Sequence, residues 1–222
     1  MGCCGSNIQQ LIPAPWYAQF KALRLTDNEI RKFLNMYQAI DRDNSGAIDL
    51  QELLNYLDIE NTSFSHRAFS VFDINNSGKI DFREFVLSLW NYCTLGNATL
   101  DVYTFDLYDK DKSGILSESE VQAMLKDLYG KTFQTNPRAT AVMNAMKKSE
   151  LRGDFDLPKF TKFVRSHQEM LFPAFQMQLK IQEKVFGRGF WERCSNRRIE
   201  ISKGKYASIT EIMNMVSKLL NA

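Results

Sequence analysis

The sequence has few of the residues that stabilise disulfide-rich or zinc-dependent folds. Its 222 residues include four cysteines and two histidines, scattered along the chain. A disulfide scaffold needs many regularly spaced cysteines, and a structural zinc site needs clustered Cys and His ligands. No hydrophobic run approaches the roughly 18 residues of a membrane-spanning helix. These shortages exclude a disulfide scaffold, a zinc fold and an integral membrane protein.

The amino terminus, MGCCGS, lacks the basic start and long apolar stretch of a secretory signal, so we expect a cytoplasmic protein. Hydrophobic residues make up 44% of the chain and charged residues 24%, as in globular proteins. The charge is unevenly distributed. Residues 1–130 contain 11 Lys/Arg and 18 Asp/Glu, whereas residues 131–222 contain 17 and 8. The two halves are therefore expected to face different partners.

Three twelve-residue segments repeat one pattern: DRDNSGAIDLQE (41–52), DINNSGKIDFRE (73–84) and DKDKSGILSESE (109–120). Each has oxygen-bearing side chains at positions 1, 3, 5 and 9, glycine at position 6, an aliphatic residue at position 8 and glutamate at position 12. This is the EF-hand loop pattern, in which six to eight oxygens surround Ca²⁺. The residue at position 7 contributes its carbonyl oxygen, so its side chain is free to vary.

The sequence predicts three Ca²⁺ sites. Their ligands are expected to be Asp41, Asp43, Ser45, Ala47, Asp49 and Glu52 in the first loop; Asp73, Asn75, Ser77, Lys79, Asp81 and Glu84 in the second; and Asp109, Asp111, Ser113, Ile115, Ser117 and Glu120 in the third.

EF-hands bury their apolar faces in pairs, so three units predict a fourth. The loop spacing places it at KSELRGDFDLPK (148–159), which keeps Gly153 at position 6 and Phe155 at position 8. Positions 1 and 12 are Lys148 and Lys159, however, so cations replace the two ends of the cage. We expect this unit to keep its fold without binding Ca²⁺.

These repeats predict an all-α fold: four EF-hands in two paired lobes, with short β-bridges between paired loops, and a helical carboxyl-terminal extension. Apolar residues at helical spacing flank each loop, and Thr26 and Glu29 form a capping box before the first one. The expected segments are an amino-terminal segment (1–24), a first EF-hand pair (25–95), a second pair (96–168) and a helical, basic extension (169–222).

Residues 25–163 resemble the calcineurin B superfamily, which includes calcineurin B, calcineurin B-like proteins and neuronal calcium sensors. The intact loop at Asp41–Glu52 and the lengthening intervals between loops are most similar to calcineurin B itself, although the fourth loop departs from it. The last sixty or so residues match none of these groups. The resemblance implies a regulated effector, such as a phosphatase catalytic subunit, a kinase, a channel or a transporter.

The amino terminus also fits the pattern for N-myristoylation, with Gly2 exposed after removal of Met1 and Ser6 in place. One myristoyl chain binds membranes only weakly, and Cys3 and Cys4 are placed for palmitoylation as a second anchor. The alternative is a tail whose cysteines have no role. Cys93 is interpreted as a core thiol, and Cys194 as a surface or packing thiol.

The carboxyl-terminal extension is expected to begin with a Phe- and Met-rich helix from Pro173 and to end with a helix capped at Ser208. Three interpretations of the first helix stay open: it folds back into an EF-hand groove, binds a partner, or extends the core. Between them, residues 184–205 carry seven Lys/Arg and two Glu. This segment is interpreted either as a contact for anionic lipid or as a solvated basic loop, and not as a nucleic-acid site.

The favoured function is a membrane-tethered calcium sensor that binds a helix of its effector in a Ca²⁺-dependent apolar groove. The alternative is a constitutive subunit that Ca²⁺ stabilises within a larger complex. An enzyme is not expected, because no nucleophile elbow, phosphate-binding loop or zinc motif occurs.

Overall fold

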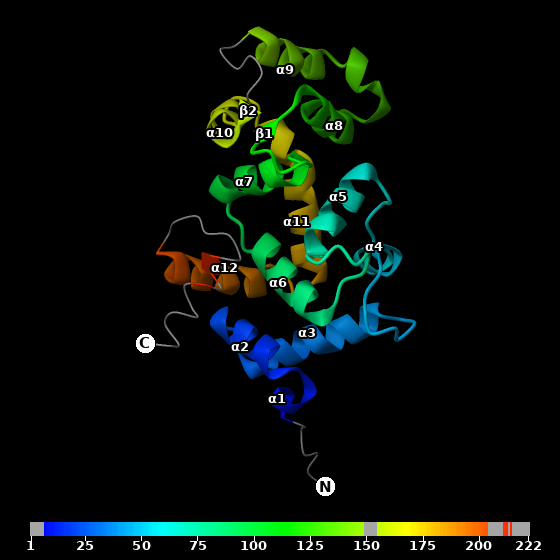
Figure 1. Ribbon diagram of the computed structural model, residues 1–222, viewed down its shortest axis with the longest axis vertical. Coiled ribbons are helices and arrows are strands. Elements are labelled where there is room, and N and C mark those ends of the chain that lie inside the picture. Colours follow the sequence, from blue (N-terminus) through cyan, green and yellow to red (C-terminus); the bar gives the residue numbers. More distant parts are fainter. Residues whose placement is uncertain (1–6, 149–154, 204–210, 213, 215–222) are drawn as a thin grey trace. The chain divides into compact units, whose positions relative to one another are not determined.

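The computed structural model describes residues 7–148, 155–203, 211, 212 and 214. Helices dominate this part of the chain, and its regular strands form one two-stranded sheet (Figure 1), which confirms the all-α prediction. The helices are α1 (Ile8–Leu11), α2 (Ala14–Ala22), α3 (Asp27–Ile40), α4 (Leu50–Leu57), α5 (Ser63–Phe72), α6 (Phe82–Cys93), α7 (Asn97–Tyr108), α8 (Glu118–Tyr129), α9 (Pro137–Lys148), α10 (Leu157–Val164), α11 (Phe172–Lys184) and α12 (Arg188–Ser202). Two 3₁₀ helices, Gly130–Thr135 and Gln168–Leu171, and the strands β1 (Ile115–Leu116) and β2 (Phe155–Asp156) complete the set.

Short β-pairings join the loops at position 8 of each repeat. Ile48 and Ile80 exchange two backbone hydrogen bonds of 2.9 and 2.8 Å. In the same way, β1 and β2 are antiparallel and pair Leu116 with Phe155. Phe155 holds position 8 of the predicted fourth loop, so that segment pairs with the third loop as an EF-hand would.

The chain divides by its internal contacts into two compact units. The first unit comprises Met1–Ile59, Phe72–Thr94 and Gln182–Ala222, and the second comprises Glu60–Val71 and Leu95–Ile181. Loops 41–52 and 73–84 belong to the first unit, and loop 109–120 belongs to the second. The segment boundaries expected from the sequence stay predictions.

Aromatic packing forms the core of the first unit. The Tyr37 ring packs edge-to-face on Phe82 and Phe85, with centroids 5.3 and 5.6 Å apart. Its hydroxyl donates hydrogen bonds to the carbonyls of Gly46 (2.9 Å) and Ile80 (3.1 Å). One buried side chain therefore ties the entering helix to both loops of this unit.

The second unit has its own aromatic core and a polar tie between helices. Phe160 of α10 packs against Phe105 of α7, with centroids 5.7 Å apart. The Asp127 carboxylate on α8 accepts hydrogen bonds from Tyr108 (3.0 Å) and Arg67 (3.2 Å). This buried carboxylate links three helices of the unit, α5, α7 and α8.

The carboxyl-terminal extension differs from the expectation in one respect. The helix predicted from Pro173 is present as α11, but the basic segment, interpreted in one alternative as a solvated loop, is mostly the helix α12. That alternative is wrong because one side of α12 is buried: Phe190, Cys194, Arg198 and Ser202 recur every fourth residue, and Trp191 lies beside them. Most of the helix predicted after Ser208 lies outside the described residues.

Cys93 and Cys194 are both free and buried, so Cys194 is a packing thiol and not a surface one. Burial raises the pKa of both thiols, that of Cys194 to about 11. The described helices include none long and apolar enough to cross a membrane.

Candidate metal centre

The first loop is held in a cage-like conformation by its own backbone. The two carboxylate oxygens of Asp41 accept hydrogen bonds from the backbone N–H groups of Ser45 (2.9 Å) and Gly46 (3.0 Å). The Ser45 N–H also donates to Asp43 (2.9 Å), and this hydrogen bond lowers the pKa of the Asp43 carboxyl. These hydrogen bonds therefore fix the orientation of both carboxylates within the loop.

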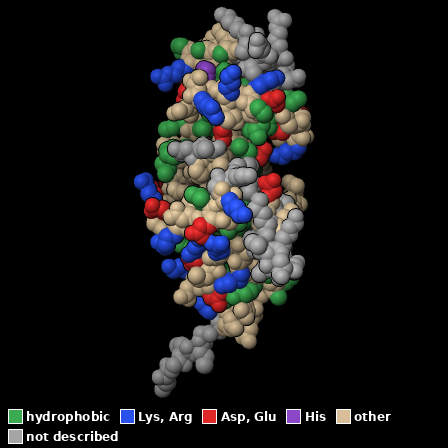
Figure 2. All heavy atoms as spheres, turned by 90° about the vertical axis from the view of Figure 1, so that its left-hand side faces the viewer, with side chains coloured by type: hydrophobic (Ala, Val, Ile, Leu, Met, Phe, Trp, Pro, Cys, Tyr) green, Lys and Arg blue, Asp and Glu red, His purple; other side chains and the backbone are tan. Residues whose placement is uncertain are grey.

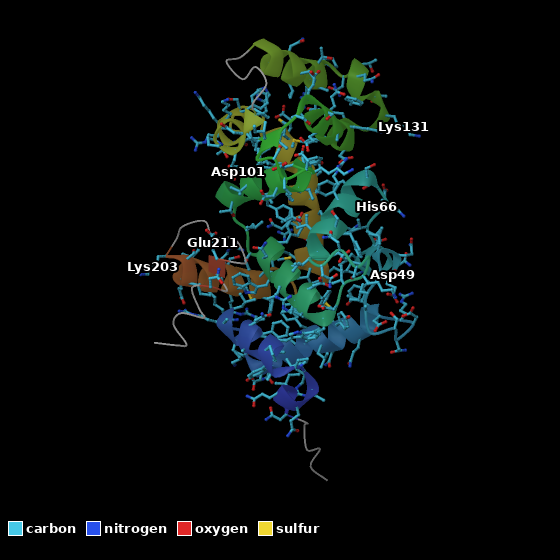
Figure 3. The ribbon with its side chains drawn as sticks, in the orientation of Figure 1. Asp49, His66, Asp101, Lys131, Lys203 and Glu211 are labelled. Carbon is cyan, nitrogen blue, oxygen red and sulfur yellow. The ribbon has the colours of Figure 1, made fainter. Side chains whose placement is uncertain are left out.

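Glu52 closes the other end of this loop. One of its carboxylate oxygens accepts from the Arg42 N–H (2.9 Å), and the other accepts from the Asp49 N–H (3.0 Å). Asp49 in turn accepts from the Glu52 N–H and so caps α4 (Figure 3). Oxygens of Asp41, Asp43 and Glu52 lie within 4.8 Å of one another, as a single cation would require.

The second loop has the same geometry with one more neutral ligand than the first. Asp73 accepts from Ser77 (2.9 Å) and Gly78 (2.7 Å), and Glu84 accepts from the N–H groups of Asn75 (3.0 Å) and Asp81 (3.0 Å). Asn75 stands where the first loop has Asp43. The loop therefore supplies one negative charge fewer within the same arrangement of oxygens.

The third loop repeats the pattern in the second unit. Asp109 accepts from Ser113 (3.0 Å) and Gly114 (2.9 Å), and Glu120 accepts from the N–H groups of Lys110 (2.8 Å) and Ser117 (2.8 Å). Oxygens of Asp109, Asp111 and Glu120 lie within 4.8 Å of one another. The Ser113 hydroxyl and its N–H lower the pKa of the Asp111 carboxyl.

Two positions of each loop have left-handed backbone, and sequence reasoning found only one of them. The position 6 glycines, Gly46, Gly78 and Gly114, have φ between +78° and +84°. Position 4 is also left-handed, with φ of 54° at Asn44, 56° at Asn76 and 57° at Lys112. Asparagine tolerates this conformation well, so the two asparagines were an available signal.

The donor set of the three loops suits a hard divalent cation. It consists of carboxylate, hydroxyl, amide and carbonyl oxygens, without nitrogen or sulfur ligands, which is the preference of Ca²⁺. At position 5, the Ser45 hydroxyl donates to the Ala47 carbonyl (2.9 Å), and the Ser77 and Ser113 hydroxyls donate likewise to the position 7 carbonyls of their own loops. These contacts bring the oxygens of positions 5 and 7 together in every loop.

The fourth segment lacks a comparable cage among the residues that are described. Asp156 accepts from the Lys159 N–H (2.9 Å) and caps α10, so it has the local role of Asp49 in the first loop. Lys159 holds the place of the closing glutamate and offers no oxygen ligand. Positions 2 to 7 of this segment lie outside the described residues.

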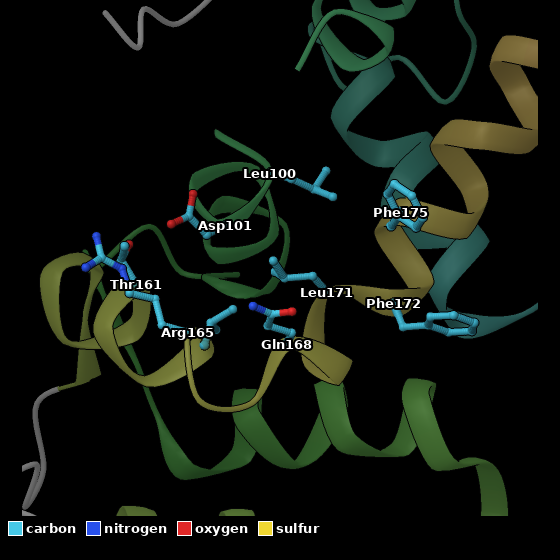
Figure 4. Close-up of a pocket in the computed structure, with 9 residues that line it drawn as sticks. Leu100, Asp101, Thr161, Arg165, Gln168, Leu171, Phe172 and Phe175 are labelled. Atoms are coloured by element: carbon cyan, nitrogen blue, oxygen red, sulfur yellow. The ribbon is translucent and has the colours of Figure 1, made fainter. Parts of the chain in front are cut away.

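An apolar pocket of about 470 Å³ lies within the second unit (Figure 4). Leu100 and Asp101 of α7 line it, together with Phe172, which is 54% exposed, and Phe175 of α11. The remaining lining residues are Thr161, Val164, Arg165, Gln168 and Leu171. An exposed phenylalanine beside a concave apolar surface is typical of a binding site.

In the first unit, aromatic side chains from the extension cover the entering helix α3. The Phe33 ring lies 4.8, 6.0 and 6.1 Å, centroid to centroid, from the rings of Phe186, Phe190 and Trp191. The Trp191 indole is 1% exposed and donates to the Val185 carbonyl (2.6 Å). The first unit therefore packs its apolar face against part of its own chain.

Polar contacts hold α12 in that place. The Arg197 guanidinium donates two hydrogen bonds, of 2.8 and 3.0 Å, to the Glu29 carboxylate at the start of α3. The buried Arg198 guanidinium donates to Asn91 and Thr94 at the carboxyl end of α6, with distances of 2.9 to 3.0 Å. Helix α12 is thus attached to both α3 and α6.

The fold and the loops define a protein of the EF-hand class. Sequence models described as EF hand and EF-hand domain match residues 38–57 and 66–89, and 102–130, respectively. These matches and the two acidic clusters indicate calcium binding.

Similar proteins identify the family within that class. The calcineurin B protein of Candida glabrata, a calcineurin subunit, is 30% identical over 131 residues, which are 59% of this chain and 75% of that protein. Its Schizosaccharomyces pombe counterpart is 30% identical over 59% of this chain and 74% of its own length. The Naegleria gruberi counterpart is 26% identical over 75% of this chain and 95% of its own length. The chain belongs to the calcineurin B family of EF-hand proteins.

Proposed function

We propose that this protein is a calcium sensor that regulates an effector protein through a Ca²⁺-dependent apolar surface. The main support is the shared geometry of the loops at 41–52, 73–84 and 109–120, whose carboxylates are oriented inward by hydrogen bonds to the loop backbone. The ligands are the eighteen residues predicted from the sequence, with the position 7 residues acting through their carbonyls. Bound Ca²⁺ supplies the positive charge that balances these clustered carboxylates. Its binding shifts the angle between the flanking helices and opens apolar surface.

The effector is proposed to be a phosphatase catalytic subunit. The relatives are named as subunits of calcineurin, so they are components of a larger assembly, and the apolar pocket of the second unit offers a place for an effector helix. EF-hand proteins bind such helices through apolar side chains at i, i+3, i+4 and i+7 spacing. This proposal assigns the protein no catalytic role of its own.

A second candidate function is a constitutive subunit in which bound Ca²⁺ stabilises an assembly. The coverage of Phe33 by Phe186, Phe190 and Trp191 favours it for the first unit, because a covered apolar face exposes little new surface when Ca²⁺ binds. On this view the first two ions act as structural ions.

Titration of the metal-stripped protein tests both functions. Calorimetry is expected to detect Ca²⁺ association at three sites, and a sensor is expected to bind a hydrophobic dye more strongly between about 10⁻⁷ and 10⁻⁵ M Ca²⁺. Heat without any dye response would support the structural subunit. Absence of Ca²⁺-dependent heat would overturn both functions.

Membrane attachment is proposed through acylation of Gly2, Cys3 and Cys4, which lie outside the described residues. The basic segment 184–205 gives little support to lipid contact, because Arg197 pairs with Glu29 and Arg198 is buried. In the space-filling view, Lys and Arg side chains of the described residues are interspersed with Asp and Glu on the visible face (Figure 2). Mass spectrometry of the native amino terminus tests the acylation, and an unmodified Gly2 would contradict it.

A further inference from the structure

The entering helices of the first and third EF-hands carry different residues at an equivalent position. Phe33 lies eight residues before Asp41, the first residue of its loop, and Asp101 lies eight residues before Asp109. Phe33 is the residue on which the α12 aromatic side chains pack, whereas Asp101 lines the pocket of the second unit (Figure 4). The same place in the repeat is therefore apolar in one unit and anionic in the other.

Asp101 is nearly buried and lacks a cationic partner in the described part of the chain. The residue is 8% exposed, and its carboxylate accepts one hydrogen bond, from the Val102 N–H (2.8 Å). No salt bridge joins it to a described Lys, Arg or His. The carboxylate lines the pocket, and low-dielectric side chains surround it, so it would attract a cation brought into the pocket more strongly than a carboxylate in open solvent would.

The other residues that line the pocket restrict which kind of ligand could carry that cation. Leu100, Val164 and Phe175 provide an apolar lining, and Phe172 is exposed at its edge. Arg165 also lines the pocket but is exposed, so water solvates its charge. An amphipathic helix with large apolar residues and one Lys or Arg on the same face matches both the apolar lining and the carboxylate.

We propose that the effector binds the second unit alone, as an amphipathic helix that places a basic residue against Asp101. The equivalent face of the first unit is not available to the effector, because α12 covers it through Phe190 and Trp191 and is held there by the Arg197–Glu29 pair. This inference rests on the proposed sensor function and specifies its partner. The apolar lining alone would bind amphipathic helices of either charge equally well. Asp101 favours those that carry a basic residue on the bound face.

Two synthetic amphipathic peptides of ~16 residues test the proposal. Both carry leucines at i, i+4 and i+7. One has a lysine centred between them, and the other has a glutamate at that position. Calorimetric titration of the full-length protein in saturating Ca²⁺ is expected to show one site that binds the lysine peptide at least about tenfold more tightly than the glutamate peptide.

A charge exchange identifies the residue responsible. Asp101→Asn is expected to abolish the preference between the peptides, and Asp101→Lys is expected to reverse it. Phe172→Asp is expected to weaken both peptides at least about tenfold, since it removes an exposed apolar side chain from the pocket. Its matched control is Ile199→Asp on α12, where the isoleucine is 56% exposed, close to the 54% of Phe172. This control is expected to leave both affinities unchanged.

Tryptophan emission reports on the first unit separately. All three tryptophans, Trp16, Trp90 and Trp191, belong to that unit. Saturation with the lysine peptide is therefore expected to leave the emission maximum unchanged. A shift of the emission, a second binding site, or sensitivity to Ile199→Asp would overturn the proposal by showing that the first unit takes part.

The outcomes separate this inference from the function on which it rests. Ca²⁺-dependent dye binding with equal affinities for the two peptides, or with binding of neither, would overturn the assignment to Asp101 while the sensor function stands. A protein that binds neither dye nor peptide in response to Ca²⁺ would overturn both. A lysine preference that follows the charge at residue 101 supports both.

Discussion

Both units contain the same helix–loop–helix repeat, but apolar surface is covered in the first unit and open in the second. The first unit has two loops of intact pattern, and α12 covers the apolar side of α3 around Phe33. The second unit has one intact loop, at 109–120, joined to a partner without a closing glutamate, and it has an open apolar pocket beside Asp101. The number of intact loops therefore does not indicate which unit offers a binding surface.

The difference has a simple physical origin. An aromatic residue at position 33 is stabilised by permanent burial against other rings, which contributes hydrophobic and edge-to-face terms. A carboxylate at position 101 is not stabilised by such a cover, because burial without a cation is unfavourable. Phe33 thus favours a permanently packed helix in the first unit, whereas Asp101, at the equivalent position, leaves the second unit open to an exchangeable partner.

The largest expected effect comes from removing the ring at the centre of the α12 contact. Trp191→Ala is expected to lower the free energy of unfolding of the first unit by about 3–5 kcal/mol, since it empties a buried volume that the surroundings refill incompletely. Urea unfolding followed by circular dichroism measures this change. Phe172→Ala, at an exposed aromatic residue of the second unit, is the control and should stay within about 0.5 kcal/mol. Equal losses in the two variants would remove the contrast between the units.

Substitution of the closing glutamates tests whether loop 109–120, and not loop 73–84, controls the Ca²⁺-dependent apolar surface. Glu120→Gln and Glu84→Gln are each expected to weaken Ca²⁺ binding at the altered loop at least about tenfold, or ~1.4 kcal/mol, because each removes the charge of a two-oxygen ligand. Only Glu120→Gln is expected to abolish the Ca²⁺-dependent rise in hydrophobic-dye fluorescence. A dye response that depends on Glu84 instead would place the sensing surface in the first unit.

The Arg197–Glu29 pair is expected to contribute less, and in a pH-dependent manner. Burial by itself raises the pKa of Glu29, but hydrogen bonds from Arg197 and Thr26 outweigh it, so the pKa of this carboxyl is lowered. The stabilisation is therefore complete above the ordinary glutamate pKa of about 4.3, and it is lost progressively as the pH falls from there through the lowered pKa of the folded state. Arg197→Ala is expected to lower the free energy of unfolding by about 1–2 kcal/mol at pH 7, and by less at pH 3.5.

An exposed ion pair that also involves α12 provides the control for this variant. Arg24 and Glu200 form a salt bridge with side chains 53% and 61% exposed. Arg24→Ala is expected to change the free energy of unfolding by less than about 0.5 kcal/mol at either pH. Both variants are compared in EDTA, so that protonation of the loop carboxylates does not enter. A pH-independent effect of Arg197→Ala would contradict the role assigned to the pair.

The smallest expected signal comes from the thiols. In a variant with Cys3→Ser and Cys4→Ser, Cys93 and Cys194 are expected to react negligibly with a thiol reagent at pH 7, because burial raises the pKa of both. Addition of Ca²⁺ should not change this, since α12 stays in place on the first unit. Ca²⁺-dependent labelling of Cys194 would show that α12 leaves and that the units are more alike than proposed.

Much of the candidate site could be predicted because its information is local. Loop positions 1 to 12, the capping boxes and the position 8 pairing all follow from short-range spacing, and Leu116↔Phe155 places the fourth segment in the register expected from the repeat. The helix α12 was harder to predict because Arg198, a charged residue, occupies its buried side, and Gly187 and Gly189 precede its aromatic residues. A buried arginine whose hydrogen-bond acceptors are oxygens of Asn91 and Thr94, about a hundred residues away, gives no signal in a hydrophobic pattern.

The sequence by itself determined the class of fold, the position of each loop and the chemistry of its oxygens, because these depend on residues within about twelve positions of one another. Only the tertiary structure decided which apolar face is covered and which is open. Phe33 and Phe190 are 157 residues apart in the chain, and their contact depends on long-range packing that no local pattern encodes. The same packing holds part of the basic segment as a helix against the first unit. Burial of Trp191 and the pairing of Arg197 with Glu29 stabilise this packed helix relative to a solvated loop.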